Sequence, residues 1–217
     1  MFKISVEEYA RRLDRPFLVA ELAQVDNYLV SVYSCQGVMA WHRHLDEDEL
    51  FMGYDGAATL ETPWGATSLS FAELVTVPKG LPHRSLSVAP ATLLLVQTRG
   101  LPWRRNGHQP GIPGVGRIEK VSIAAEAAQL SGFYSPRRIA TSDSLAVSVE
   151  ICFGPEQWHT HPVDELVFCQ YGQLLLETEE AIAPLMRGEF AVVRAGERHC
   201  LEAGQPATVV LFSKEGP

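Results

Sequence analysis

The sequence predicts an all-β protein built from two tandem barrels, each preceded by a short helix. Short β-branched runs separated by Gly, Pro and Asp turns occur along the 217 residues, a pattern typical of sandwiches and barrels. The tetrapeptide Trp-His-Arg-His at residues 41–44 returns as Trp-His-Thr-His at residues 158–161. Between these copies, the stretch 101–118 is rich in Gly and Pro and interrupts regular structure. We therefore expect an N-terminal barrel over 1–100, a linker over 101–118 and a C-terminal barrel over 119–217.

The composition is that of a globular protein. Hydrophobic residues make up 46% of the chain, which suffices for a sizeable core and excludes intrinsic disorder. The formal net charge of -8 disfavours nucleic acid and anionic membrane surfaces as partners. No apolar run approaches the roughly 20 residues of a membrane span, and the acidic start of the chain is unlike a signal peptide. Four cysteines without a CxxC pair are typical of a reduced, cytoplasmic protein.

The repeat covers nearly the whole of each half and predicts an internal duplication. Val30-Ser31-Val32 matches Val147-Ser148-Val149 in the register of the two Trp-His motifs. After a deletion of one residue, Asp48-Glu49-Leu50 matches Asp164-Glu165-Leu166, and the new register continues to residue 208. An average domain of about 150 residues leaves the domain count open. The repeat favours two copies of one small barrel.

The elements follow in the same order in both halves. A serine with an acidic residue three positions later predicts a helix over 5–13, and the alanine-rich stretch 122–130 is its counterpart. Apolar β-branched runs predict strands over 28–33, 74–77, 91–97, 145–152, 174–178, 190–193 and 207–212.

Six of the seven histidines occur in one arrangement that is present twice. The first set is His42, His44, Glu49 and His83, and the second is His159, His161, Glu165 and His199. Residues i and i+2 of a strand face the same side, so both histidines of each HxH pair can point into the barrel. Three imidazoles and one carboxylate suit a divalent transition metal (Fe, Mn, Ni, Co, Cu or Zn), and they leave open positions for a substrate. We expect up to two metals per chain, whereas His108 in the linker is expected to be solvated.

Two details of the sites follow from register and alternation. Glu47 also follows the first HxH pair closely, but Glu49 keeps the register of the repeat, so we expect the side chains of 46–48 to form a solvated acidic loop. Strand alternation places these residues on the inner faces: Phe51, Gly53, Ser85, Val167, Cys169 and Leu201. It places Arg43, Arg84 and Arg198 outside, which argues against a small dianion as substrate.

These motifs resemble those of the cupin superfamily, and the chain as a whole is similar to a compact bicupin. The first cupin motif, G(x)5HxH(x)3–4E(x)6G, fits from His42 to Gly56 and from His159 to Gly172, with Gly37 and Gly154 each one residue too close. The second motif, G(x)5PxG(x)2H(x)3N, fits at Pro78-x-Gly80-x-x-His83 and at Gly196-x-x-His199. It departs at Ala72 and Arg194, and neither half has the final asparagine. The resemblance implies jelly-roll barrels and the same eight metal ligands.

The function we expect is that of a metal-dependent oxidoreductase of the dioxygenase type, acting on a small organic molecule. Glu49 and Glu165 are the candidate catalytic residues, because a carboxylate at the metal can also accept a substrate proton. Two alternatives stay open: a non-redox isomerase or lyase acting on a sugar or keto acid, and a binding or sensor protein without turnover. The family resemblance also leads us to expect a homodimer.

Overall fold

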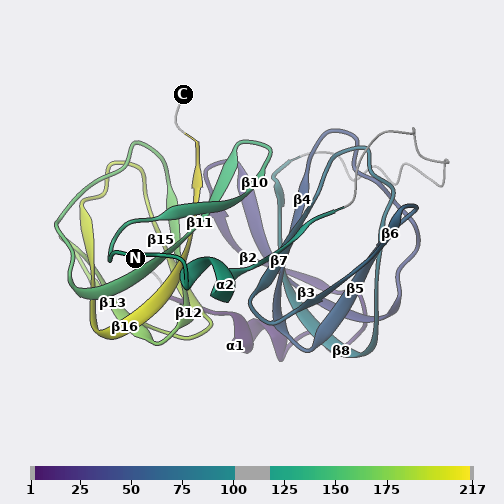
Figure 1. Ribbon diagram of the computed structural model, residues 1–217, viewed down its shortest axis with the longest axis horizontal. Coiled ribbons are helices and arrows are strands. Elements are labelled where there is room, and N and C mark those ends of the chain that lie inside the picture. The colour runs from purple at the N-terminus through teal and green to yellow at the C-terminus, as the bar shows by residue number, and fades with distance from the viewer. Residues whose placement is uncertain (1–2, 101–117, 216–217) are drawn as a thin grey trace. The chain divides into compact units, whose positions relative to one another are not determined.

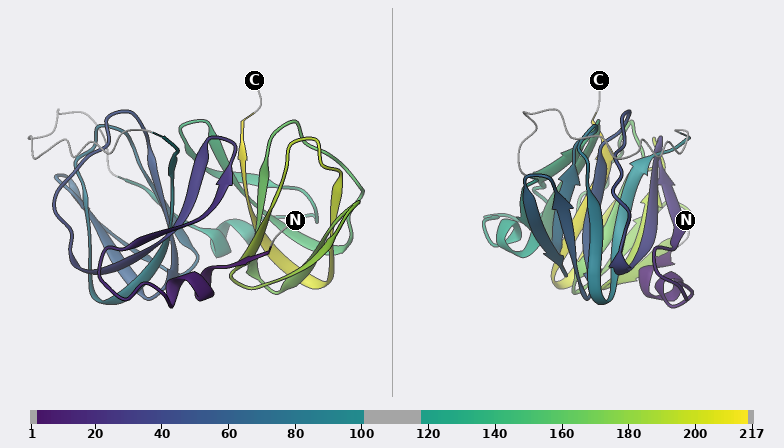
Figure 2. Two further views of the ribbon diagram at one scale, coloured as in Figure 1. Left: turned by 180° about the vertical axis from the view of Figure 1, so that it is seen from behind. Right: turned by 90° about the vertical axis from the view of Figure 1, so that its right-hand side faces the viewer.

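The computed structural model describes residues 3–100 and 118–215, and its architecture is all-β, as predicted. Two eight-stranded sheets of antiparallel strands each curl into a barrel (Figure 1). The rear view shows the curvature of both barrels clearly (Figure 2). Most of the expected linker lies outside the described residues, and so does His108, which we expected to be solvated. In the described part of the chain, no helix is long and apolar enough to cross a membrane.

The sheet of the first barrel contains all the strands predicted for the N-terminal half. Its strands are β2 (Val19–Val25), β3 (Tyr28–Val38), β4 (Glu49–Asp55), β5 (Ala57–Thr62), β6 (Gly65–Ser70), β7 (Glu73–Val77), β8 (Arg84–Thr98) and β9 (Lys120–Ser122). The long strand β8 is the centre of this sheet, because it pairs with β3, β4 and β5.

The sheet of the second barrel has the same order of pairings. Its strands are β1 (Ile4–Ser5), β10 (Arg137–Ser142), β11 (Leu145–Pro155), β12 (Glu165–Tyr171), β13 (Gln173–Thr178), β14 (Ile182–Met186), β15 (Glu189–Val193) and β16 (His199–Lys214). Strand β16 takes the central place that β8 has in the first barrel, pairing with β11, β12 and β13.

Each sheet takes one short edge strand from the other half of the sequence. Strand β1 pairs with β15, with Ile4 opposite Phe190. Strand β9 pairs with β7, with Val121 opposite Leu74. The chain accordingly divides into one compact unit of 1–7, 23–26 and 123–217 and another of 8–22 and 27–122. This exchange of edge strands was not indicated by the sequence.

The two helices occur where expected but are short. They are α1 (Val6–Ala10) and α2 (Ile123–Ala127), five residues each. Ser5, the expected helix cap, immediately precedes α1 and is also the last residue of β1. After α1, the amides of Arg12 and Leu13 donate to carbonyls three residues earlier, which ends the helix as a tight turn.

Apolar side chains fill the interior of each barrel. The first interior is lined by residues such as Cys35, Phe51 and Leu93, and the second by residues such as Cys152 and Val209. Cys35 and Cys152 are fully buried free thiols, as expected of small hydrophobic residues. These interiors surround the polar clusters described next.

Candidate metal centres

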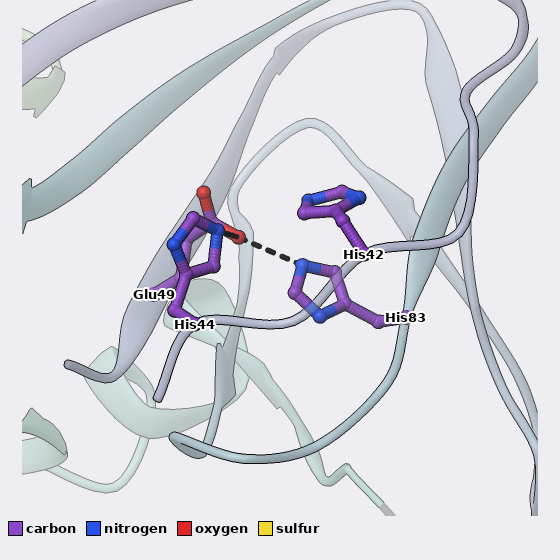
Figure 3. Close-up of side chains that lie close together, drawn as sticks. All are labelled: His42, His44, Glu49 and His83. Atoms are coloured by element: carbon purple, nitrogen blue, oxygen red, sulfur yellow. Dashed lines mark hydrogen bonds and ion pairs between the residues drawn. The ribbon is translucent and has the colours of Figure 1, made fainter. Parts of the chain in front are cut away.

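The first set of candidate ligands comes together in the first barrel (Figure 3). One ligand atom from each of His42, His44, Glu49 and His83 lies within 4.8 Å of the others. The HxH segment is not a regular strand, contrary to our expectation. His42 forms an isolated backbone bridge with His83, with two N–H···O bonds of 3.0 and 2.9 Å, and His44 lies in the following loop. Glu49 is the first residue of β4.

Backbone carbonyls fix the ring orientation of two of these histidines. The Nδ1 of His42 lies 3.0 Å from the carbonyl oxygen of Ala40, and the Nδ1 of His83 lies 3.0 Å from that of Leu81. In each ring, an Nδ1–H that donates to the carbonyl turns the Nε2 toward the cluster, where it can bind a metal when it carries no proton. Such an outer hydrogen bond is the usual support of a metal-binding histidine.

Glu49 is buried and held from two sides. Its Oε2 lies 2.8 Å from the Nε2 of His83, and its Oε1 accepts a 2.8 Å hydrogen bond from the side-chain Nε2 of Gln97. Burial alone would raise the pKa of Glu49. The hydrogen bond from His83 and the charges of the histidines outweigh it, so that the pKa lies below the ordinary value. The group is therefore an anionic ligand at neutral pH.

Glu47 is the position where the acidic loop differs from the solvated loop that we expected. Its side chain is buried: Oε1 lies 3.4 Å from the Nδ1 of His44, and Oε2 accepts a 2.8 Å hydrogen bond from the amide of Thr98. Burial would lower the pKa of His44, but the carboxylates of Glu47 and Glu49 raise it overall. Register alone selected Glu49 as the ligand. The structure assigns Glu47 to the far side of the His44 ring.

The second set of candidate ligands forms a similar cluster in the second barrel. Ligand atoms of His159, His161, Glu165 and His199 also lie within 4.8 Å of one another. The backbones of His159 and His199 bridge through two 2.9 Å hydrogen bonds. Their Nδ1 atoms lie 3.0 and 3.1 Å from the carbonyl oxygens of Gln157 and Glu197, which repeats the arrangement of the first barrel.

The second cluster is more open than the first. The side chain of His161 is 36% exposed, against 18% for His44. Val163 stands two residues before Glu165, where Glu47 precedes Glu49, so a carboxylate cannot support the ring of His161 from that position. Ser213 has the place in β16 that Gln97 has in β8. It lies opposite Glu165 in the pairing of β16 with β12.

The residues expected to line the pockets lie mostly where alternation placed them. Phe51 packs edge-on against the ring of His83, and Cys169 belongs to the apolar interior of the second barrel. Gly53 is different: a Cβ there would lie 1.9 Å from the carbonyl oxygen of Ser70, so this position is filled by backbone and does not widen a pocket. Arg84 stacks on Trp41 at 4.9 Å from the ring centroid, away from the ligands as predicted.

A metal ion fits both clusters by the chemistry of their donor atoms. The Nε2 atoms of His44 and His199 are buried and have no hydrogen-bond partner in the described structure. These atoms lie 3.5 and 3.6 Å from the Oε2 of Glu49 and of Glu165, and a buried ring nitrogen without a hydrogen bond is costly unless something binds it. Imidazole nitrogens together with one carboxylate suit first-row divalent transition metals. The residues that would hold a metal are thus the four of each cluster.

Comparison with known proteins identifies the fold. Scans of family models and of curated proteins give no match to the sequence. Among solved structures, a cupin 2 conserved barrel domain protein from Leptotrichia buccalis superimposes with a TM-score of 0.76 at 12% identity, covering 99% of this chain and 96% of that chain. A salicylate 1,2-dioxygenase from Pseudaminobacter salicylatoxidans gives 0.76 at 10% identity, with 96% and 81% covered. AerE from Microcystis aeruginosa gives 0.60 at 11% identity, with 94% and 95% covered. The chain has the two-barrel fold of the cupin superfamily.

Proposed function

We propose that the protein is a metal-dependent oxidoreductase of the dioxygenase type that acts on a small organic molecule. The observation that carries the proposal is the set of three histidines and one buried carboxylate at the end of an apolar barrel interior. A redox-active ion such as Fe²⁺ would supply activation of dioxygen and polarisation of a substrate oxygen. The salicylate dioxygenase supports the proposal to the extent that the same two-barrel fold carries such chemistry.

The residues of the first cluster have distinct roles in this proposal. His42, His44 and His83 bind the ion through their Nε2 atoms, and Glu49 completes the set. Because the pKa of Glu49 is lowered, its carboxylate is free to accept a proton from a substrate hydroxyl near neutral pH. The apolar side chains behind the cluster, Phe51 among them, exclude water from that substrate.

The test is anaerobic reconstitution with Fe²⁺, Mn²⁺, Ni²⁺, Co²⁺ or Cu²⁺, followed by oxygen uptake on a panel of phenols and diketones. We expect uptake with at least one redox-active metal, and its loss in His42→Ala or His159→Ala, according to which barrel is active. Turnover with Zn²⁺ in the absence of oxygen would favour an isomerase or lyase instead. No uptake with any redox-active metal across the panel would overturn the proposal.

A further inference from the structure

Two hydroxyl groups meet inside the first barrel, next to the metal cluster. The Oη of Tyr33 and the Oγ of Ser85 are 2.6 Å apart, and both side chains are buried. Ser85 lies two residues after His83, so the two side chains extend to the same side of the chain. The ring of Tyr33 packs edge-on against Phe51 with 6.4 Å between centroids, and Phe51 packs against His83 at 6.3 Å. The Tyr33 ring is thus one side chain, Phe51, removed from the ring of His83.

This pair has one O–H donor without a strong acceptor. Two hydroxyls carry two hydrogens, and their mutual hydrogen bond uses one of them. The other hydrogen faces the thioether of Met39, whose Sδ lies 3.4 Å from the Oη of Tyr33 and 3.7 Å from the Oγ of Ser85, and the thiol of Cys35, which interacts with both hydroxyls. A thioether is a weak acceptor. An anionic ligand oxygen would be a much better partner for this hydrogen.

The second barrel has different chemistry at the same three places. Glu150 replaces Tyr33, since each stands two residues before the buried cysteine of its strand. Glu156 and Leu201 take the places of Met39 and Ser85. Glu150 is 3% exposed, and its Oε1 accepts a 3.5 Å hydrogen bond from the thiol of Cys152. Glu156 accepts a 3.0 Å hydrogen bond from the amide of Leu201 and lies 3.7 Å from the Nδ1 of His159.

The two interiors thus offer opposite environments to an anion. The first presents neutral hydroxyls beside Glu49, with Glu47 on the far side of the His44 ring. The second presents Glu150 and Glu156 in addition to Glu165, and no hydroxyl at the position of Ser85. Like charges in a poorly solvated interior repel strongly. An anionic oxygen accordingly finds a hydroxyl donor in the first barrel and meets two additional buried or half-buried glutamates in the second.

We propose that Tyr33 and Ser85 determine the ligand specificity of the first barrel: they orient a ligand with a carboxylate or other anionic oxygen at the first cluster, and the second barrel does not bind such a ligand. This inference rests on the proposed metal site. It assigns different ligand preferences to the two barrels of one chain, and it names the substrate class of the first.

The experiment compares two single-site proteins loaded with Co²⁺, using acetate as the probe. His159→Ala/His161→Ala leaves the first cluster, and His42→Ala/His44→Ala leaves the second. Cobalt titration comes first and tests the metal sites themselves; acetate affinity is then read from the visible absorption of Co²⁺ at pH 8. We expect acetate to bind the first-cluster protein at least about tenfold more tightly, the size of effect typical for hydrogen bonds to a charged group.

Substitutions in the first-cluster protein test whether the hydroxyl pair, and not another feature of the barrel, causes the tighter binding of acetate. Tyr33→Phe and Ser85→Ala should each weaken acetate binding by about tenfold and leave cobalt affinity within about twofold. Ser87→Ala is the matched control, because Ser87 lies further along the same strand and donates to the carbonyl of Ala57 at 2.7 Å. Its acetate affinity should not change.

The outcomes separate this inference from the proposed function. Equal acetate affinity at the two clusters, acetate binding at neither, or Tyr33→Phe and Ser85→Ala behaving like Ser87→Ala would overturn the inference and leave the metal sites standing. If the second cluster binds no cobalt, the three substitutions in the first-cluster protein still test whether Tyr33 and Ser85 bind the anionic oxygen. If the first cluster binds no cobalt, both the metal site and the inference fail.

Discussion

The Nδ1 of His44 lies 3.4 Å from the Oε1 of Glu47, and the other oxygen of that carboxylate is anchored by the amide of Thr98. The two carboxylate oxygens of Glu47 thus contact the ring of His44 on one side and the end of β8 on the other. The second barrel has Val163 in its place. A carboxylate behind a metal-binding imidazole orients the ring and increases its basicity. This contact separates the two centres more clearly than their ligand residues, which are identical in type.

Glu47→Gln should therefore weaken metal binding at the first centre by about 10–100-fold, the range found for outer-sphere partners of metal ligands. Competition titration with a chromophoric chelator measures this in His159→Ala/His161→Ala protein. Asp55→Asn is the control, since it removes the same charge at the exposed end of β4. Equal metal affinities of the Glu47 and Asp55 variants would show that Glu47 does not support His44.

Metal binding should stabilise the folded protein. A ligand that binds only the folded state, at one hundred times its dissociation constant, adds about 3 kcal/mol to the free energy of unfolding. For a chain of this size, that raises Tm by about 5–10 °C. Thermal unfolding with Co²⁺, and then with an excess of EDTA, measures the shift and its reversal. A Tm that does not respond to either addition would contradict the proposed centres.

The exchanged edge strands should give each unit a dependence on a distant part of the sequence. Ile4→Pro removes a backbone donor and disfavours the pairing of β1 with β15, so amide exchange should rise in Glu189–Val193. Val121→Pro should raise exchange in Glu73–Val77 instead, through the loss of β9 from β7. Hydrogen–deuterium exchange with mass spectrometry resolves these peptides.

Each of these two variants serves as the control for the other. Exchange that rises in the same peptides for both variants would indicate general destabilisation. Exchange that rises in neither β15 nor β7 would contradict the pairing of β1 with β15 and of β9 with β7.

Glu150 should make the metal-free protein less stable as the pH rises. Burial, followed by the nearby charge of Glu156, raises the pKa of Glu150 to about 7, above the 4.5 of an ordinary glutamate. Because the folded state holds this proton more tightly, its stabilising effect is complete below about pH 4.5 and is lost as the pH rises through about 7. The loss amounts to about 3 kcal/mol.

Urea unfolding in EDTA at pH 5 and at pH 8 tests this for the wild type and for Glu150→Gln. The amide cannot ionise. The free energy of unfolding of Glu150→Gln, relative to that of the wild type, should therefore be higher at pH 8 than at pH 5. Glu177→Gln, which changes a partly exposed glutamate of β13, should follow the wild type. A stability difference between wild type and Glu150→Gln that stays constant with pH would contradict a buried, protonated Glu150.

Much of the fold and of the candidate sites could be predicted from the sequence, because both depend on residue spacing. The repeat and the β-branched runs indicated two all-β barrels. The register of the HxH segments singled out the residues that the structure brings together, including Glu49 over Glu47. The role of Glu47 could not be predicted, since it depends on how a short loop folds back toward Thr98.

Other features were not accessible because they depend on contacts between distant strands. A two-residue strand such as β1 has no recognisable period, so its pairing with β15 left no signal. Gln97 directly follows the apolar run of residues 93–96, which could have indicated an inward-facing partner for Glu49. The hydroxyl pair of Tyr33 and Ser85 needed the pairing of strands before the two residues could be placed together.

The metal content of purified protein, reconstituted and then freed of unbound ions, tests the central claim most directly. Elemental analysis should find two equivalents of a divalent transition metal per chain in the wild type. It should find one in His42→Ala/His44→Ala and one in His159→Ala/His161→Ala. Substoichiometric metal in the wild type, or a metal content that neither double variant lowers, would contradict the account.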